Sequence, residues 1–428
     1  MSYQESLQVL LTLERFGVQP GLERIEVLLD ALGHPEERLR ILHVGGTNGK
    51  GSTSAILASI LEAAGLRVGL YTSPHLLAFP ERIRIGGHPL PEATVVRWVE
   101  RIQPLLETIQ PTFFEATTAL ALGAFAEASV DIAVLEVGMG GRLDATTVGR
   151  PLVSILTPIS YDHQAYLGTR LTEIAAEKAA IIRSGPAVVA EQAREAMGIV
   201  EARAHAVGVP LFRAGVELRV RVRENNLQGQ IIDLEGPDWR YDGCTLSLLG
   251  LFQPGNALLA IAALHASGIS VSETAIRLGL ARVFWPGRFQ LIQENPALVL
   301  DGAHNPAGAQ ALASSLRHYF PGQALTLVIG ISRDKEIAGI LKILAPLASR
   351  VILTAAQNPR AADPAELRAH LSALEGEVVL VASLAEALPL ADQDLAGVTV
   401  VTGSLFLVAD ALAWCEKKPW SLRTPMIR

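Results

Sequence analysis

Val44-Gly45-Gly46-Thr47-Asn48-Gly49-Lys50-Gly51-Ser52-Thr53 joins an apolar run at residues 42–44 to a segment with helical spacing at 53–64. A glycine-rich loop in this place puts unpaired backbone N–H groups and the positive end of a helix dipole at one point. Glycines allow close approach of the backbone to a ligand, and Lys50 adds a positive charge. The loop therefore predicts polyphosphate binding in an α/β domain.

The general P-loop pattern, G-x-x-x-x-G-K-[ST], is not met by this loop. Val44 stands at the first glycine position, and Gly51 follows Lys50 in place of a hydroxyl residue. Glycine-rich turns before helices also occur where no ligand binds. From the loop alone, a tight structural turn therefore stays open as the alternative.

Length and charge limit the classes of protein to which this chain can belong. A chain of 428 residues is longer than one core usually supports, so we expect two domains. The net charge of −7 and the pI near 5.9 give no basic surface for nucleic acid. Cys244 and Cys415 are the only cysteines, and the first five residues lack the features of a signal peptide. We therefore expect a cytoplasmic protein without a disulfide framework.

One uncharged segment, residues 244–272, is long enough to cross a bilayer. Gln253-Pro254-Gly255-Asn256 interrupts it, and His265 and Gly268 follow. This pattern favours a loop and a buried helix at 257–266 over a membrane span. We expect no membrane partner.

Apolar runs alternate with helical segments through the first half of the chain, which predicts a P-loop-type, mostly parallel sheet covered on both faces. The expected strands are 41–44, 68–72, 132–137, 153–157 and 187–190. Apolar and charged residues then alternate strictly at 216–223, and further strands are expected at 230–234 and 245–249. This change of period predicts a small antiparallel β appendage with one wet face.

A second alternation predicts a smaller C-terminal α/β domain of Rossmann-like type. Its expected strands are 298–301, 325–330, 351–354, 378–381 and 398–402. We place the two domains at 1–288 and 296–428, with the linker near 286–296.

Polar residues follow several strands of the first domain. Ligands of open α/β sheets bind beyond the carboxyl ends of the strands. Glu136 ends one strand, as does the acid that holds a nucleotide's magnesium in P-loop enzymes, while Ser73 and His163 follow two others. A solvated carboxylate, a serine turn before Pro74 and a structural histidine are the alternatives. Three polar strand ends beside a lysine loop favour a magnesium–nucleotide site.

The second domain repeats this pattern with Asp301-Gly302-Ala303-His304-Asn305-Pro306. An acid ends the first strand, and a His–Asn pair opens the following helix. A helix N-cap is the alternative interpretation of Asp301. Polar strand ends in two domains predict a site between the domains, so the residues alone indicate a magnesium–nucleotide enzyme.

The motifs together resemble those of bacterial folylpolyglutamate synthases, members of the Mur ligase superfamily that are often bifunctional as dihydrofolate synthases. The resemblance runs from about residue 21 to about residue 409 and includes the family's G-T-N-G-K-G-S loop at 46–52. Matching segments follow in family order at 72–76, 82–85, 113–117, 135–146, 162–168, 177–179, 255–257, 285–288, 301–306 and 334–335. Thr147 and Ala180 replace the usual Asn and Gly, and neither change removes a catalytic group.

The resemblance implies ATP and magnesium, with two ions, and a carbamylated Lys178. Without the family, a helix-surface charge is the natural interpretation of Lys178. A carbamate turns this cation into a carboxylate-like anion that can hold a metal or its waters. The implied catalytic residues are Lys50, His163, Lys178 and His304; the ATP contacts are Gly49, Lys50, Gly51, Ser52, Asn256, Arg288 and Asp301; the metal ligands are Ser73, Glu136 and His163.

The resemblance also implies the reaction. A ligase of this family joins L-glutamate to the carboxylate of a folate or dihydropteroate through an acyl phosphate made with ATP. We expect small-molecule substrates as the only partners, and a monomer. The implied folate or pterin contacts are Leu22, Phe113, Phe114, Glu115, Leu143, Asp144 and Ala145, and the implied glutamate contacts are His304, Asn305 and Ser404.

Two other functions stay open. A Mur-type peptidoglycan ligase would share the acyl-phosphate chemistry, but the segment at 113–117 and the short stretch before the phosphate loop argue against it. A nucleotide-binding regulatory protein without turnover is the alternative from another class. The intact Lys50, Glu136, His163 and Lys178 argue against that alternative.

Overall fold

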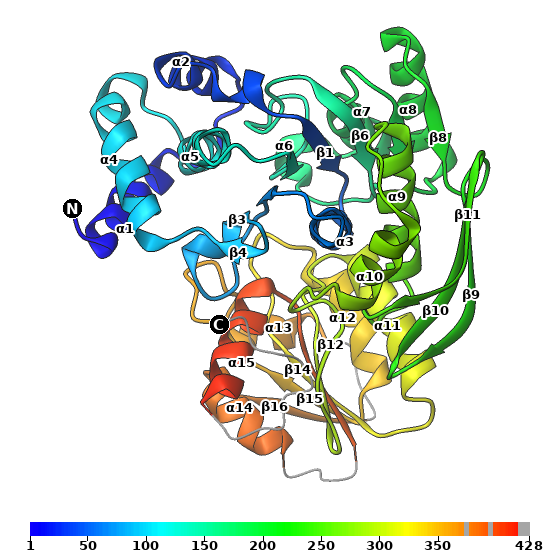
Figure 1. Cartoon of the computed structure of the whole chain (residues 1–428). Helices are drawn as coiled ribbons and strands as arrows, with labels where there is room; N and C mark the ends of the chain where they lie inside the picture. Colours follow the sequence, from blue (N-terminus) through cyan, green and yellow to red (C-terminus); the bar gives the residue numbers. More distant parts are fainter. Residues whose placement is uncertain (372–375, 393–396, 418–428) are drawn as a thin grey trace. The chain divides into compact units, whose positions relative to one another are not determined.

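The computed structural model describes residues 1–371, 376–392 and 397–417. This part of the chain forms two compact units, which we describe separately (Figure 1). The first comprises Met1–Arg223, Ile231–Leu246 and Pro254–Val283, and the second comprises Glu224–Gln230, Ser247–Gln253 and the chain from Phe284 onward. Both are of the α/β type, which confirms the predicted fold class. The domain limits 288 and 296 stay a prediction, and the limit at 428 lies outside the described residues.

An eight-stranded sheet forms the centre of the first unit. Its strands, in spatial order, are β4 (His88–Pro89), β3 (Ile83–Ile85), β2 (Val68–Tyr71), β5 (Ile132–Glu136), β1 (Ile41–Gly45), β6 (Pro151–Leu156), β7 (Ala187–Val189) and β8 (Leu211–Arg213). The strands from β2 to β8 in this order pair in parallel and include all five predicted strands. The antiparallel edge strands β3 and β4, and β8 at the other edge, were not predicted. These three strands are too short to show a periodic pattern.

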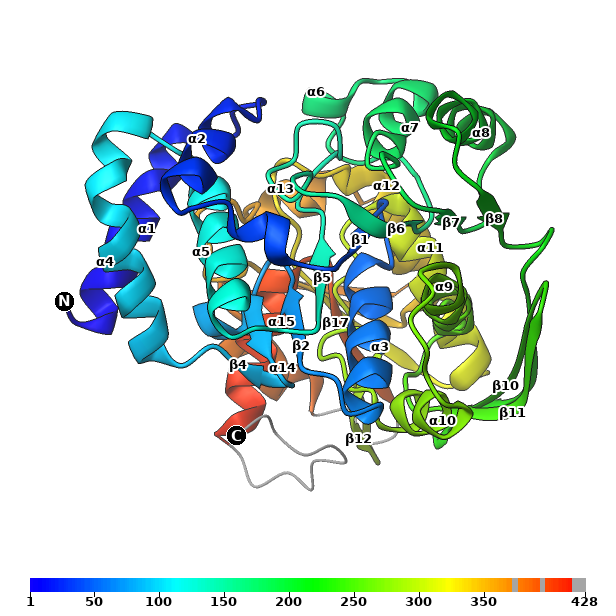
Figure 2. The same cartoon turned by 45° about the horizontal axis from the view of Figure 1, so that its top comes forward.

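Helices cover both faces of this sheet, as predicted (Figure 2). One face shares a hydrophobic core with α1 (Tyr3–Thr12), α2 (Glu23–Ala31), α4 (Glu92–Ile109) and α5 (Phe113–Glu127). On the other side, α3 (Lys50–Ala63) packs against β1, β2 and β5. α5 is buried from Glu115 to Phe125 and contacts β2 of the sheet.

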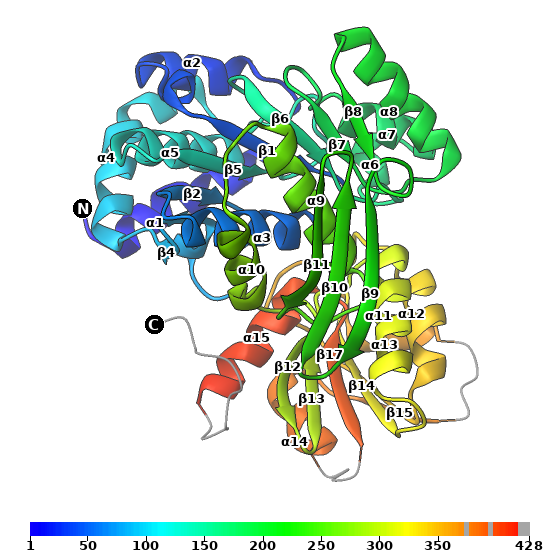
Figure 3. The same ribbon diagram turned by 45° about the vertical axis from the view of Figure 1, so that its right-hand side comes forward.

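The remaining helices of the first unit are α6 (Gln164–Leu167), α7 (Leu171–Ala179), α8 (Arg194–Val207), α9 (Gln253–Ala266) and α10 (Glu273–Arg282). α10 lies beside α3 (Figure 3). Gly279 permits this close approach, since a Cβ there would lie 2.5 Å from the Ile60 Cα.

The segment 253–256 corrects one prediction. We expected it to interrupt the chain as a loop, but it forms the first turn of α9. Pro254 is tolerated there because the first N–H groups of a helix have no partner within the helix. No helix in the described ranges combines the length and the apolar character of a membrane span.

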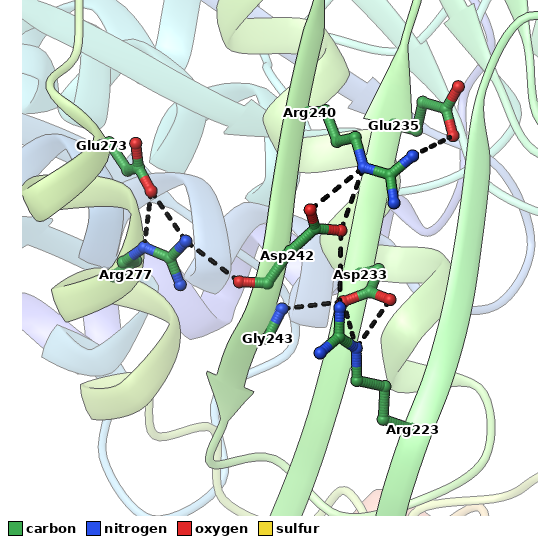
Figure 4. A network of polar contacts seen from close by, with 8 residues as sticks. All are labelled: Arg223, Asp233, Glu235, Arg240, Asp242, Gly243, Glu273 and Arg277. Atoms are coloured by element: carbon green, nitrogen blue, oxygen red, sulfur yellow. Dashed lines mark hydrogen bonds and ion pairs between the residues drawn. The ribbon is translucent and has the colours of Figure 1, made fainter.

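Three strands form the predicted antiparallel appendage: β9 (Arg219–Asn226), β10 (Gly229–Gly236) and β11 (Trp239–Leu246). Charged side chains connect them (Figure 4). Arg223 Nε lies 2.7 Å from Asp233 Oδ1 and Arg223 Nη2 lies 3.6 Å from Asp242 Oδ1. Arg277 of α10 donates to the Asp242 carbonyl at 3.0 Å, so the same network attaches α10 to β11.

The predicted limits and burial of this appendage were partly wrong. The strand expected at 216–223 begins at Arg219, and the one expected at 245–249 ends at Leu246. β9 has no buried residue, and Val222 is 43% exposed. β9 is an edge strand, and its Arg223 pairs with Asp233 and Asp242 across the sheet. The alternation along β9 therefore does not mark a half-buried face.

A six-stranded sheet forms the centre of the second unit (Figure 3). Its strands, in spatial order, are β12 (Gln290–Glu294), β13 (Ala297–Leu300), β17 (Val398–Thr402), β14 (Leu325–Ile329), β15 (Arg350–Leu353) and β16 (Glu377–Leu380). Its helices are α11 (Pro306–Tyr319), α12 (Ile337–Leu344), α13 (Pro364–Ala369), α14 (Leu384–Ala391) and α15 (Leu405–Glu416). The five parallel strands are the five that we predicted.

β12 corrects the predicted linker. It lies within the stretch 286–296 and runs antiparallel to β13, with Glu294 opposite Ala297. The turn residues Glu294-Asn295-Pro296, which suggested a linker, instead close a hairpin within the second sheet.

Candidate active site

The phosphate loop lies at the carboxyl end of β1, before α3. β5 and β6 flank β1, with Val44 opposite Glu136 and Gly45 opposite Leu156. Within the described chain, no side chain caps the start of α3, and no acidic residue occupies its first turn. The backbone N–H groups and the dipole of this helix therefore favour an anion at Lys50 and the residues after it.

Two glycines of the loop are required by the backbone and by their neighbours. Gly46 has φ of +130° and Gly49 has φ of +95°, both in the region that favours glycine. A Cβ on Gly46 would lie 2.8 Å from the Thr157 carbonyl oxygen, and one on Gly49 would lie 2.6 Å from Asn256 Oδ1. The structure therefore places Asn256, a predicted ATP contact, beside the loop.

Two predicted lysines meet at one carbonyl oxygen of the loop. Lys50 Nζ donates to the Thr47 carbonyl at 3.1 Å and to the Gly46 carbonyl at 3.3 Å. Lys178 Nζ, from the last turn of α7, donates to the same Gly46 carbonyl at 3.0 Å. Lys178 is only 3% exposed, so its interpretation as a helix-surface charge is wrong.

Glu136 and Ser73 lie at the same edge of the sheet. Glu136 is 5% exposed, so it is not the solvated strand-end charge of the alternative interpretation. The backbone N–H of Ser73 donates to Glu136 Oε2 at 3.1 Å. This bond brings the segment after β2 to the end of its neighbour β5.

The segment that carries His163 is attached to the phosphate loop. The Thr47 hydroxyl donates to the Ser160 carbonyl at 3.1 Å, and the Thr47 N–H donates to the Pro158 carbonyl at 2.9 Å. His163 stands at the N-cap position of α6, with Nε2 3.9 Å from Asp162 Oδ1. The structure thus joins the loop, Ser73, Glu136 and the His163 segment at one sheet edge.

The chemistry of these donors suits a magnesium ion that a nucleotide carries. Magnesium is usually held by one or two protein carboxylates together with substrate phosphates and waters. Across the described ranges, no three His, Cys, Asp or Glu side chains gather as a protein-only metal cage. A buried carboxylate, Glu136, beside a hydroxyl residue and a phosphate loop fits the nucleotide-borne arrangement.

Most predicted folate-side residues share one hydrophobic cluster. Leu22, Phe113 and Phe114 pack against a core that includes Ala145. A Cβ on Gly138 would lie 2.5 Å from Phe114 Cζ, so α5 contacts the start of the loop at 138–146. Leu143 is half-buried in that same loop.

Glu115 is the carboxylate of this region whose surroundings most favour contact with a ligand. It is 4% exposed, and its Oε2 accepts hydrogen bonds from the Thr112 N–H at 2.7 Å and from Arg24 Nε at 3.1 Å. Its Oε1 is buried and accepts no hydrogen bond from the described residues. A buried carboxylate oxygen without a donor is costly unless a ligand supplies one. Arg24 was missed, because its sequence neighbours give no sign that it reaches α5.

Asp144 organises the loop that carries it. Its Oδ2 accepts from the Met139 N–H at 2.9 Å, and its Oδ1 accepts from the Thr146 hydroxyl at 2.6 Å. Burial raises the pKa of Asp144, and these hydrogen bonds oppose the shift. Thr147, which replaces the family's usual Asn, donates to the Gly141 carbonyl at 2.6 Å and so closes the same loop.

His43 of β1 supports this loop and was not predicted. Its Nε2 lies 2.9 Å from the Thr146 hydroxyl. Because that hydroxyl donates to Asp144, His43 donates through Nε2. Burial, reinforced by the charge of Arg183, lowers the pKa of His43 to about 3, so the ring is neutral near neutral pH.

The second unit gathers its predicted residues at the ends of the neighbouring strands β13 and β17. Asp301 is 5% exposed and accepts hydrogen bonds from the Phe289 N–H at 2.8 Å and the Ala303 N–H at 2.9 Å. Burial raises the pKa of Asp301, and the charge of Arg288 opposes the shift. His304 Nδ1 lies 2.8 Å from the Gly302 carbonyl.

The N-cap interpretation of Asp301 is wrong, because Asn305 caps α11. The Asn305 side chain accepts a hydrogen bond from the Gly308 N–H at 2.8 Å. Ser404 caps α15 in the same way, with the Leu407 N–H at 3.1 Å. Two of the three predicted glutamate contacts are therefore helix caps in this structure.

Comparison with known proteins defines first the class. Residues 44–264 match the Mur ligase middle domain, and residues 287–405 match the Mur ligase glutamate ligase domain. The phosphate-loop edge and the two α/β units are thus those of a Mur ligase.

Full-length relatives then define the family. The chain is 38% identical to the dihydrofolate synthase/folylpolyglutamate synthase of Bacillus subtilis, over 81% of this chain and 84% of that protein. It is 36% identical to a Mycobacterium tuberculosis folylpolyglutamate synthase solved with ADP and AMPPCP, with a TM-score of 0.89 over 97% of this chain and 100% of that one. An Escherichia coli relative in complex with DHPP and ADP gives a TM-score of 0.87 at 35% identity, over 96% of this chain and 98% of that one. The chain belongs to the folylpolyglutamate synthase/dihydrofolate synthase family.

Proposed function

We propose that the chain is an ATP-dependent ligase that joins L-glutamate to the carboxylate of a folate or dihydropteroate through an acyl phosphate. The observation that carries the proposal is the uncapped start of α3, where Lys50 and Lys178 both reach the Gly46 carbonyl beside Glu136. Membership of the ligase family supports it. Cytoplasmic location and a monomeric state stay predictions.

ATP binds at the phosphate loop. The N–H groups of Gly49, Gly51 and Ser52 hold its phosphates, and Lys50 exchanges the Thr47 and Gly46 carbonyls for phosphate oxygens. Asn256 beside Gly49 is a further contact, and we assign Arg288 and Asp301 of the second unit to the nucleotide as well. The ADP and AMPPCP complexes of the M. tuberculosis relative support this assignment.

Ser73, Glu136 and His163 hold magnesium with the nucleotide, and two ions are proposed. The metal supplies neutralisation of phosphate charge, which lets an anionic carboxylate approach. Glu136 is suited to this role because its neighbours at the sheet edge already fix its Oε2.

The reaction proceeds in two steps. A carboxylate oxygen of the acceptor attacks the γ-phosphorus of ATP, the bond to the β–γ bridging oxygen breaks, and ADP leaves. The amine of L-glutamate then attacks the acyl carbon, and phosphate leaves with one former carboxylate oxygen. Lys50 and the amides of α3 stabilise the charge on the transferred phosphoryl group.

His304 is the proposed base of the second step. Its Nδ1 faces the Gly302 carbonyl, which accepts only, so Nδ1 carries the proton and Nε2 is the basic nitrogen. Nε2 takes the proton that the attacking amine loses. Asn305 and Ser404 bind glutamate in this proposal while they continue to cap their helices.

The acceptor binds along the start of α5. Leu22, Phe113, Phe114 and Ala145 provide an apolar surface for a heterocycle, with Leu143 and Asp144 in the adjacent loop. Glu115 Oε1 accepts an N–H of that heterocycle, which satisfies the buried oxygen. The DHPP complex of the E. coli relative supports a ligand of this chemical kind.

We assign a carbamate to Lys178. Carbon dioxide adds to the neutral amine, an N–C bond forms, and one proton leaves. Two ammonium groups at the Gly46 carbonyl repel each other, whereas a carbamate keeps one N–H for that carbonyl and adds an anionic group. This anion supports the magnesium or its waters.

The test is a substrate panel with purified protein, measured as ADP release. We expect release only when magnesium, L-glutamate and a pteroate or folate acceptor are all present. Equal release without an acceptor, or release with a UDP-muramyl acceptor in its place, would contradict the proposal. ATP binding without release under any of these conditions would favour the regulatory alternative.

A further inference from the structure

Arg82 lies where the folate-side cluster approaches the magnesium edge, and the proposed function leaves it without a role. It ends a short 3-10 turn, Phe79–Arg82, and its carbonyl accepts the Thr72 N–H at 2.9 Å, next to Ser73. Its guanidinium carbon lies 5.2 Å from the centre of the Phe113 ring. Arg82 therefore connects a predicted acceptor residue with a predicted metal residue.

The guanidinium uses only one of its donors within the described protein. Nε donates to His75 Nδ1 at 2.8 Å, and among the described residues Arg82 has no ion pair and no hydrogen bond from its two Nη groups. The neighbouring Glu81 is engaged elsewhere, since it accepts the N–H groups of Leu76, Leu77 and Ala78. The charges of Glu14, Glu81 and Glu136 also act on Arg82, but none of these carboxylates forms an ion pair with it in the described protein. A half-buried guanidinium whose Nη groups lack acceptors is unfavourable unless a ligand supplies them.

His75 adds a donor of defined direction. Because its Nδ1 accepts from Arg82, its proton is on Nε2. The ring stands edge-on to Phe79 at 6.3 Å, and Phe79 stands edge-on to Phe113 at 6.3 Å. The aromatic rings thus hold both His75 and Arg82 in place, with two Nη groups and one imidazole N–H to offer.

We propose that Arg82, assisted by His75, binds a substrate carboxylate that does not react: the α-carboxylate of a glutamate unit. A guanidinium fork matches a carboxylate in two parallel hydrogen bonds. The proposal rests on the proposed function, which supplies two sources of this group. One is the glutamate tail of an already glutamylated acceptor, and the other is the incoming L-glutamate.

The two sources of the carboxylate predict different changes in KM when Arg82 is replaced, as in Arg82→Met and Arg82→Lys. If the tail of the acceptor binds, KM for a glutamylated folate rises roughly 10- to 100-fold, as expected for loss of charged hydrogen bonds, while KM for dihydropteroate, which has no tail, is unchanged. If L-glutamate binds, its KM rises with both acceptors. Arg82→Lys keeps the charge but not the fork, so its effect is smaller in either case.

Arg101→Met is the matched control, because Arg101 also lies over an aromatic ring, 4.8 Å from Trp98, but on the exposed side of α4. His75→Asn can still accept from Arg82 Nε but lacks the Nε2 donor, so we expect a smaller rise in the same KM. KM values within twofold of the parent for all three substrates in folded Arg82→Met would overturn the proposal, as would a loss confined to kcat.

Equilibrium binding of a glutamylated folate, measured without ATP, separates this proposal from the proposed function. If the parent protein forms no ADP with any acceptor, the ligase proposal fails. Weaker binding of the glutamylated ligand by Arg82→Met, with Arg101→Met equal to the parent, would still support the carboxylate site. Equal binding of the glutamylated folate by all three proteins would reject the acceptor tail as the source of the carboxylate. An unchanged KM for L-glutamate in Arg82→Met would then reject the site as a whole.

Discussion

The two units begin their site helices in opposite ways. In the first, the N-cap residue of α3 is Gly49, and within the described chain no side chain caps the helix, while Lys50 and Lys178 donate to a carbonyl of the preceding loop. In the second, Asn305 and Ser404 are the N-cap residues of α11 and α15, and their side chains cap these helices. An uncapped helix start leaves N–H groups for a ligand, whereas a capped one satisfies them internally.

This difference separates two kinds of functional residue. Substitution of Lys50 or Lys178 in the first unit removes a group that we expect to act on a ligand. It should therefore lower the rate of the reaction with little effect on folding. Substitution of the caps in the second unit should lower stability as well.

Lys178→Ala should be nearly inactive, with a loss on the order of 1,000-fold or more, at the upper end of single electrostatic groups in active sites. The reason is that the carbamate proposed on Lys178 would supply an anion that supports the metal. Acetate should restore part of the activity by filling the vacated space, and intact mass measured under bicarbonate should show the added group. An unmodified Lys178 that points to solvent in a magnesium–ATP complex would refute the carbamate and leave the ligase assignment standing.

Lys50→Ala should lower kcat by about 100-fold or more with saturating ATP, because one charge on the transferred phosphoryl group is lost. The fold should survive, as judged by circular dichroism and thermal unfolding. Lys342→Ala, at an exposed position of the second unit, is the control for loss of a lysine. A folded Lys50→Ala protein with the turnover of the parent would show that the uncapped helix start does not serve phosphate.

A fall in pH should change the stability of the two units in opposite directions. His43 has its pKa lowered from 6.5 to about 3, so the unfolded chain takes up a proton that the native first unit does not. Stability is therefore lost as pH falls below the unfolded pKa, by about 2 kcal/mol between about pH 6.5 and about pH 5. The pKa of Asp301 is raised by burial, so the native second unit binds its proton more readily than the unfolded chain.

The measurement is urea unfolding of the parent and of His43→Gln at about pH 7 and about pH 5. Gln can donate to Thr146 without titrating, so the variant should lose most of the acid-induced destabilisation. In the parent, the raised pKa of Asp301 makes the second unit less stable as pH rises above the ordinary aspartate pKa. Asp301→Asn cannot titrate at this position, so this pH dependence should be absent from the variant. Parallel pH dependence in the parent and His43→Gln would contradict the neutral, buried histidine.

Asn305→Ala and Ser404→Ala should each lower the free energy of unfolding by about 1 kcal/mol, the usual cost of a lost N-cap. Asn305→Asp and Ser404→Thr keep a capping oxygen and should retain most of the stability. Gln310→Ala, at an exposed position of α11, is the control. Loss of activity in the alanine variants without loss of stability would contradict the stabilising cap role of Asn305 and Ser404, because these side chains would then serve the ligand alone.

The central strands and the phosphate loop could be predicted from the sequence, because long apolar runs and glycines at fixed places leave a local signal. β3, β4 and β8 could not, since two or three residues show no period. The predicted burial of one face of β9 was wrong, and Val222 is exposed. Alternation of apolar and charged residues looks the same in a sequence whether one face of a strand is buried or a charge such as Arg223 pairs across an edge strand.

Site residues divide in the same way. Glu136 and Lys178 stand in recognisable segments, but only the fold shows that both are buried. Arg24 and His43 act over long distances in sequence, on Glu115 and Thr146, and no local pattern reports such a contact. The cap roles of Asn305 and Ser404 depend on where each helix begins, which sequence patterns place only to within a few residues.

The central claim is that the acceptor carboxylate is activated as an acyl phosphate at the phosphate loop. The direct measurement uses an acceptor whose carboxylate carries oxygen-18, with unlabelled ATP, L-glutamate and magnesium. The account predicts that one labelled oxygen appears in the inorganic phosphate released with each amide bond formed. Amide product accompanied by phosphate without the label would contradict it.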